Sequence, residues 1–144
     1  NLHMPEAYPE HLEAGTQNLV GIAALNAGVQ YVQSHQKEIM EKEYFLLQKL
    51  YEGLSGYVEF YSSLDNSTPI VAINIPGKDS AYVSDVLNYK YGIVTRCGAH
   101  CAPLMHKHLK TEERGIVRLS LSFQNALEEI DFVIRAIREI SNDY

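Results

Sequence analysis

Residues 96–108 hold the densest group of chemically reactive side chains in the chain. The run reads Arg-Cys-Gly-Ala-His-Cys-Ala-Pro-Leu-Met-His-Lys-His, and it contains both cysteines and three of the six histidines. A thiol beside cationic groups tends to lose its proton, and the thiolate is the nucleophilic form of cysteine. The glycine at position 98 permits a tight turn. This run is therefore the first candidate for a functional site.

Residue types and spacing leave three interpretations of the run open. The first is a surface loop with incidental polar residues. The second is a metal site, although the spacing matches none of the common structural zinc patterns. Its possible ligands are Cys97, His100, Cys101 and either His106 or His108. The third makes Cys101 a nucleophile on a flexible loop, with Arg96 and Arg118 binding an anionic substrate, although Arg118 could also be a solvated strand residue.

The surrounding hydrophobic pattern predicts helices and short strands. Residues 19–54 carry apolar side chains at intervals of three and four, which is typical of a long amphipathic helix. Strand-like runs follow at 57–60, 70–75, 93–96 and 116–121, with a helix over 79–89. Asn125 and Glu128 predict the cap of a last helix. We therefore expect an α+β fold, a small and mostly antiparallel sheet covered by helices and preceded by one long helix.

Composition narrows the possible partners. The formal net charge of the 144 residues is −6, which argues against a large nucleic-acid interface, because such a surface must neutralise phosphates. No apolar run approaches the roughly 20 residues that span a bilayer, and we expect no membrane partner. Two cysteines do not form a disulfide scaffold. We therefore expect a cytoplasmic protein with free thiols.

Three segments, taken in order, carry a resemblance to a known family. They are Glu13-Ala14-Gly15-Thr16-x-Asn18, Arg96-x-Gly98-x-His100-Cys101-Ala102-Pro103, and Gly115 to Ser120 followed by Asn125 and Glu128 to Asp131. The second segment resembles the active-cysteine loop of cysteine desulfurases, which are class V aminotransferase relatives. The resemblance covers nearly the whole chain. It implies the C-terminal small domain of a pyridoxal-phosphate enzyme of fold type I.

The resemblance also implies roles for individual residues. Cys101 would attack the sulfur of L-cysteine bound to pyridoxal phosphate, releasing L-alanine and leaving a persulfide on Cys101. Arg118 would bind the substrate carboxylate, and Arg96 would assist nearby. Thr16 would reach the cofactor phosphate of the partner subunit, which implies a homodimer, although Thr16 could instead cap the long helix. No metal is implied, and the sulfur acceptor protein is unknown.

The chain departs from the family pattern in one respect that matters for catalysis. The lysine that forms the Schiff base belongs to the large domain, and none of the seven lysines here stands in the Ser-x-His-Lys-like setting that it requires. We therefore expect residues 1–18 to be the tail of a missing cofactor domain or a cloning remnant, and residues 19–144 to form the small domain. We expect these residues to be inactive alone, with no cofactor bound.

Two other functions stay open at this point. The parent could be another class V aminotransferase or a selenocysteine lyase, which would use the same cofactor on a different substrate. Alternatively, the chain could be a non-catalytic interaction or dimerisation domain. The expected partners of the desulfurase are its own large domain, a second subunit, L-cysteine and a sulfur acceptor.

Overall fold

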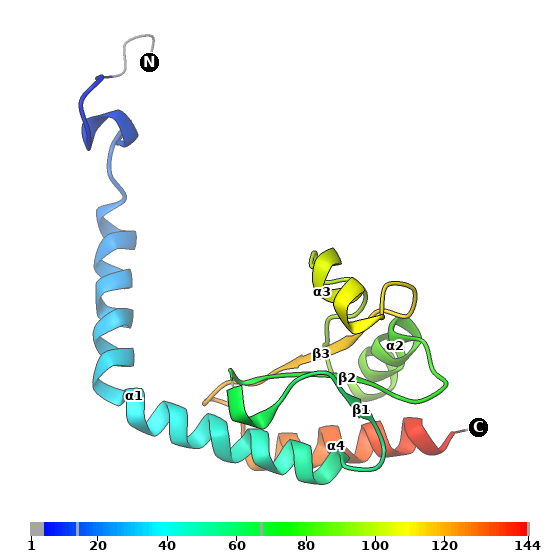
Figure 1. Cartoon of the computed structure of the whole chain (residues 1–144). Coiled ribbons are helices and arrows are strands. Elements are labelled where there is room, and N and C mark those ends of the chain that lie inside the picture. Colours follow the sequence, from blue (N-terminus) through cyan, green and yellow to red (C-terminus); the bar gives the residue numbers. More distant parts are fainter. Residues whose placement is uncertain (1–4, 14, 67, 144) are drawn as a thin grey trace. The chain divides into compact units, whose positions relative to one another are not determined.

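The computed structural model describes residues 5–13, 15–66 and 68–143. Its elements in order are η1 (Glu10–Leu12), α1 (Leu19–Leu54), β1 (Glu59–Phe60), η2 (Leu64–Asn66), β2 (Ile70–Asn74), α2 (Ser80–Tyr91), α3 (Pro103–Leu109), β3 (Val117–Ser120) and α4 (Leu127–Asn142), where η denotes a 3₁₀ helix (Figure 1). The chain divides into two units, Asn1–Lys37 and Glu38–Tyr144, and the division falls within α1. No helix in the described ranges combines the length and the apolar character needed to cross a bilayer.

The first unit is a short 3₁₀ turn followed by the N-terminal half of α1. The side-chain Oδ1 of Asn18 accepts a hydrogen bond of 2.9 Å from the backbone N–H of Gly21, so Asn18 rather than Thr16 caps the helix. The apolar stripe of this half is exposed, with exposed fractions of 53% at Ile22 and 68% at Leu25. The predicted helix is therefore present over 19–54, but its apolar stripe is buried only farther along.

The second unit is built on a three-stranded antiparallel sheet with the order β1-β2-β3. In β2 and β3, Val71 pairs with Leu119 and Ile73 pairs with Val117, and all four side chains are buried. Because side chains alternate between the faces of a strand, Ala72 and Arg118 point to the opposite face. One face of the sheet thus belongs to the core, and the other carries a charged residue.

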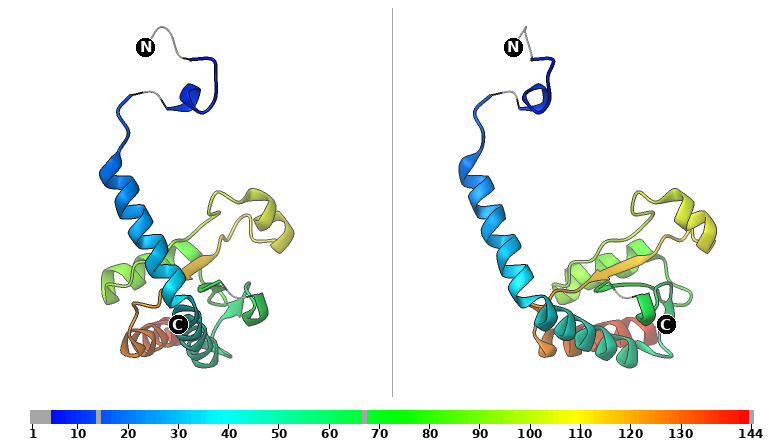
Figure 2. Two further views of the ribbon diagram at one scale, coloured as in Figure 1. Left: turned by 90° about the vertical axis from the view of Figure 1, so that its left-hand side faces the viewer. Right: turned by 60° about the vertical axis from the view of Figure 1, so that its left-hand side comes forward.

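Two helices cover the core face. The C-terminal half of α1 and the whole of α4 run side by side in each view (Figures 1 and 2). Leu50 of α1 and Ile137 of α4 are fully buried, and the Arg138 Nε–H donates to the carbonyl of Gly53 at 2.8 Å. A Cβ at Gly53 would lie 2.4 Å from Cδ1 of Ile134, so this glycine allows the two helices to approach closely.

The remaining helix of substantial length, α2, packs against β3 and α4. Asp79 caps it by accepting hydrogen bonds from the N–H groups of Ala81 and Tyr82, and Gly92 ends it in a left-handed conformation with φ of 67°. The helix predicted over 79–89 is therefore present, over Ser80–Tyr91. The predicted α+β fold, with a small antiparallel sheet, covering helices and one long leading helix, is confirmed.

Two local predictions were wrong. The cap of α4 is Ala126, whose N–H donates to the Glu129 carboxylate at 2.9 Å, rather than Asn125 paired with Glu128. The Asn125 amide is used one turn earlier, where its Oδ1 accepts from the N–H of Ser122. The strand expected over residues 93–96 is reduced to a single bridge, in which Arg96 pairs with Arg118.

Candidate active site

The cysteine loop connects the bridge at Arg96 to the start of α3. Two consecutive residues of this loop, His100 and Cys101, adopt left-handed backbone conformations, with φ of 50° and 57°. Such conformations cost on the order of 1–3 kcal/mol each in non-glycine residues and gather at functional sites. The loop is held by hydrogen bonds from His100 Nε2 to the Arg96 carbonyl at 3.1 Å and from the Ala102 N–H to the Ala99 carbonyl at 2.8 Å.

The loop presents the thiol of Cys101 to solvent beside a guanidinium group. Cys101 is exposed, whereas Cys97 is partly buried. Arg96 Nη2 donates a hydrogen bond to Sγ of Cys101 at 3.5 Å. The thiol is therefore accessible from solvent and in contact with a cationic side chain.

Backbone pairing brings the second arginine to the same place. The N–H of Arg118 donates to the Arg96 carbonyl at 2.7 Å, and the N–H of Arg96 donates to the Arg118 carbonyl at 3.3 Å. Directly paired residues of antiparallel strands project to the same face, so both guanidinium groups stand on the side of the sheet that faces away from the core. Among the described residues, neither group forms an ion pair with a carboxylate.

The imidazole of His100 lies close to these cations. Its pKa is lowered, first by desolvation and then by the positive charges of Arg118 and Arg96 and by neighbouring His106. The ring of His100 meets that of His106 edge to face, with ring centroids 5.7 Å apart. The structure therefore gathers Cys101, Arg96, Arg118 and His100 around one site.

His106 is a supporting residue of this site. It is buried, and its Nδ1 is 2.9 Å from the hydroxyl oxygen of Thr111. Across the described ranges, no group of three or more His, Cys, Asp or Glu side chains is arranged to hold a metal ion. This geometry gives no support to the interpretation of His106 as a metal ligand.

Thr16 belongs to the first unit and not to the unit that contains the cysteine loop. Its side chain is exposed. Its assignment to the cofactor phosphate rests on the resemblance alone and stays a prediction.

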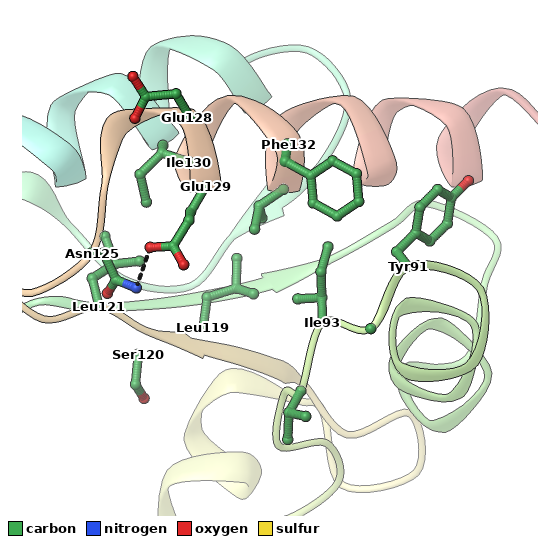
Figure 3. Close-up of a pocket in the computed structure, with 13 residues that line it drawn as sticks. Tyr91, Ile93, Leu119, Ser120, Leu121, Asn125, Glu128, Glu129, Ile130 and Phe132 are labelled. Carbon is green, nitrogen blue, oxygen red and sulfur yellow. Dashed lines mark hydrogen bonds between the residues drawn. The ribbon is translucent and has the colours of Figure 1, made fainter.

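A cleft of the second unit lies away from these residues. It has a volume of about 470 Å³ and opens between α4, the outer edge of β3 and the segment that follows α2 (Figure 3). Tyr91 and Phe132 line one end, and the hydrogen-bonded pair Asn125 and Glu129, 3.1 Å apart, lines the other. Neither Arg96 nor Arg118 lines this cleft, and neither cysteine does. The candidate site is therefore the surface around the exposed Cys101.

Comparison with known proteins identifies the family of the chain. The model of the family described as Aminotransferase class-V matches residues 3–133. A probable cysteine desulfurase of Methanothermobacter thermautotrophicus is 32% identical to this chain over 145 residues, covering 94% of the chain and 35% of that protein. A second, of Pyrococcus abyssi, is 34% identical over 136 residues, covering 92% of the chain and 33% of that protein.

A solved structure shows the same fold. The apo structure of a cysteine desulfurase from Thermococcus onnurineus superposes with a TM-score of 0.82 at 32% identity, over 92% of this chain and 34% of that one. The chain thus spans about a third of the length of the relatives that it matches. With a family model that covers most of its residues, the chain belongs to the class V aminotransferase family.

Proposed function

We propose that the chain is the C-terminal domain of a cytoplasmic cysteine desulfurase that uses pyridoxal phosphate. One observation carries the proposal above the others. Two guanidinium groups that form no ion pair with a carboxylate of the described residues stand on one face of the sheet, and one of them contacts an exposed thiol at 3.5 Å. Two unpaired cations on one face favour an anionic ligand, and the thiol is placed to react with that ligand.

The residues around Cys101 are suited to binding the amino-acid substrate. Arg118 would hold the carboxylate of L-cysteine, for which a planar guanidinium is well suited because it can donate two parallel hydrogen bonds. Pyridoxal phosphate, when bound, serves as an electron sink for the amino acid. Thr16 would hold its phosphate, in the partner subunit of a homodimer. The lysine that binds the cofactor would come from a large domain outside these residues.

Cys101 would then act as the nucleophile. Its thiolate attacks the sulfur atom of L-cysteine, an S–S bond forms, and the C–S bond of the substrate breaks. The Cβ atom that loses the sulfur takes up a proton. L-cysteine and the Cys101 thiol therefore give L-alanine and a Cys101 persulfide. Arg96 would contact the sulfur of Cys101 and orient it for the attack. A sulfur acceptor protein would later remove the outer sulfur.

The proposal is tested on the chain joined to the sequence encoded immediately upstream of Asn1. We expect this protein with pyridoxal phosphate to form alanine from cysteine, and the 144 residues alone to form none. Cys101→Ala should abolish alanine formation, whereas the matched variant Cys97→Ala should retain it. An equal loss of alanine formation in Cys101→Ala and Cys97→Ala would refute the role of Cys101 as the nucleophile.

The same variants separate the alternative functions. An aminotransferase would produce a keto acid from an amino acid, and Cys101→Ala would leave that activity intact. A selenocysteine lyase would prefer selenocysteine to cysteine in the same alanine assay. A non-catalytic interaction domain would form no alanine in any combination, and its upstream sequence would encode no lysine-bearing domain.

A further inference from the structure

Two buried polar atoms without hydrogen-bond partners lie on the sheet face that carries Arg118, and one of them belongs to Arg118 itself. They are Oδ1 of Asn74 and Nε of Arg118, and no other buried side-chain nitrogen or oxygen of the described residues lacks a partner. One is an acceptor and the other a donor. Asn74 is 1% exposed, so bulk water does not reach its amide.

Strand register places these two residues on the same face. Ala72 pairs with Arg118 and Ile73 pairs with Val117. Asn74 therefore stands two positions along β2 from the partner of Arg118, and side chains alternate between the faces. Such diagonal neighbours are roughly 7–8 Å apart at Cα, within reach of a long side chain.

The orientation of the Asn74 amide is fixed by its other hydrogen bond. Nδ2 donates to the carbonyl of Gly115 at 2.8 Å. A carbonyl oxygen only accepts, so the amide nitrogen must face Gly115 and Oδ1 must face elsewhere. The buried amide thus keeps one acceptor free on the face that carries Arg118.

We propose that Asn74 is a positioning residue for Arg118 and acts through one buried water. The water accepts a hydrogen bond from Nε–H of Arg118 and donates one to Oδ1 of Asn74. Buried waters typically join polar groups that the protein leaves unpaired. This arrangement fixes the direction of the guanidinium and leaves its two terminal nitrogens for the substrate carboxylate. The last step rests on the proposed function.

The same amide also supports the cysteine loop. Gly115, which Asn74 holds, packs against Gly98, because a Cβ at Gly115 would lie 2.7 Å from the Gly98 Cα. The N–H of Ile116 further donates to the Gly98 carbonyl at 3.3 Å. Asn74 therefore connects the strand that carries Arg118 to the loop that carries Cys101.

The first test follows the Nε–H proton of Arg118 by NMR in the isotope-labelled chain. We expect this proton to exchange slowly with solvent in the unmodified chain and to exchange rapidly in Asn74→Ala. Ser80→Ala is the matched control, because the Ser80 hydroxyl donates to the neighbouring Arg114 carbonyl at 2.7 Å and so also supports the segment before β3. Ser80→Ala should leave the exchange slow.

The second test uses the protein extended by its upstream sequence. We expect Asn74→Ala to raise KM for cysteine roughly tenfold or more, with a smaller change in kcat, because a misplaced carboxylate contact weakens substrate positioning. Rapid exchange of the Arg118 proton in the unmodified chain would overturn the inference even if Asn74→Ala failed to fold. An equal effect of Ser80→Ala would reduce Asn74 to a structural role. Neither the proton-exchange result nor the Ser80→Ala result depends on persulfide formation. The role of Asn74 can therefore be refuted while the proposed function stands, and the reverse also holds.

Discussion

Gly115 is the position where a single methyl group should disturb both the fold and the site. Its φ of 65° lies in the left-handed region, and a Cβ there would meet Ser80 Oγ at 2.6 Å and the Gly98 Cα at 2.7 Å. Left-handed backbone costs a non-glycine residue about 1–2 kcal/mol. Forcing extra volume into a packed site costs about 1–3 kcal/mol more. Gly115→Ala should therefore lower the free energy of unfolding by about 2–5 kcal/mol.

Gly77 provides a matched control for this substitution. It has a similar φ of 75°, but no atom lies within 4 Å of the position that its Cβ would occupy. Gly77→Ala should therefore cost only the backbone strain of about 1–2 kcal/mol. Urea unfolding followed by circular dichroism measures both values, and their difference isolates the contact with Gly98 and Ser80.

Thiol reactivity adds a functional measurement to this comparison. In a Cys97→Ser background, Gly115→Ala should change the rate at which Cys101 reacts with a thiol reagent, because displacing Gly98 moves the cysteine loop. Gly77→Ala should leave that rate unchanged. Equal destabilisation by the two alanines, together with an unchanged Cys101 rate, would refute the reasoning that Gly115 positions the loop.

Three further predictions test separate parts of the structure. Leu50→Ala, at a fully buried position, should cost about 2–5 kcal/mol in urea unfolding, whereas Leu25→Ala, at a position 68% exposed, should change stability by no more than about 0.5 kcal/mol. Asp79→Ala should cost about 1 kcal/mol by removing the α2 cap, and Asp79→Asn should recover most of it. Because desolvation lowers the pKa of His100 below its ordinary 6.5, the unfolded chain takes up a proton that the folded chain resists. Stability should therefore fall as the pH drops below 6.5, and His100→Asn should flatten that dependence.

The sequence was sufficient to predict helices that have a long periodic pattern or a clear local pattern. The span of α1 followed from its helical periodicity over 36 residues, and the helix predicted over 79–89 is present as α2 over Ser80–Tyr91. The sequence could not show which part of the α1 stripe is buried, because burial depends on what packs against it. Leu50 lies in the core and is fully buried, whereas Ile22 is also a large apolar residue of the stripe and is 53% exposed.

The contacts of the candidate site likewise include some between residues close in sequence and some between residues far apart in sequence. Arg96 and Cys101 are five residues apart, so their contact lay within reach of pattern analysis. The pairing of Arg118 with Arg96 depends on strand register, which no local signal determines. Asn74 was missed because its hydrogen-bond partner Gly115 is 41 residues away and an asparagine in an apolar strand carries no distinctive motif. The cap of α4 was misplaced because Asn125 serves the preceding turn instead.

The central claim is that Cys101 receives the sulfur atom, and mass spectrometry tests it most directly. The chain joined to its upstream domain is incubated with pyridoxal phosphate and cysteine, trapped with an alkylating reagent and digested with trypsin. The peptide between Arg96 and Lys107 carries both cysteines, so its fragment ions must assign the added mass. We expect one additional sulfur atom on Cys101 and none on Cys97. Alanine formation without sulfur on Cys101, or with sulfur on Cys97 instead, would contradict the account.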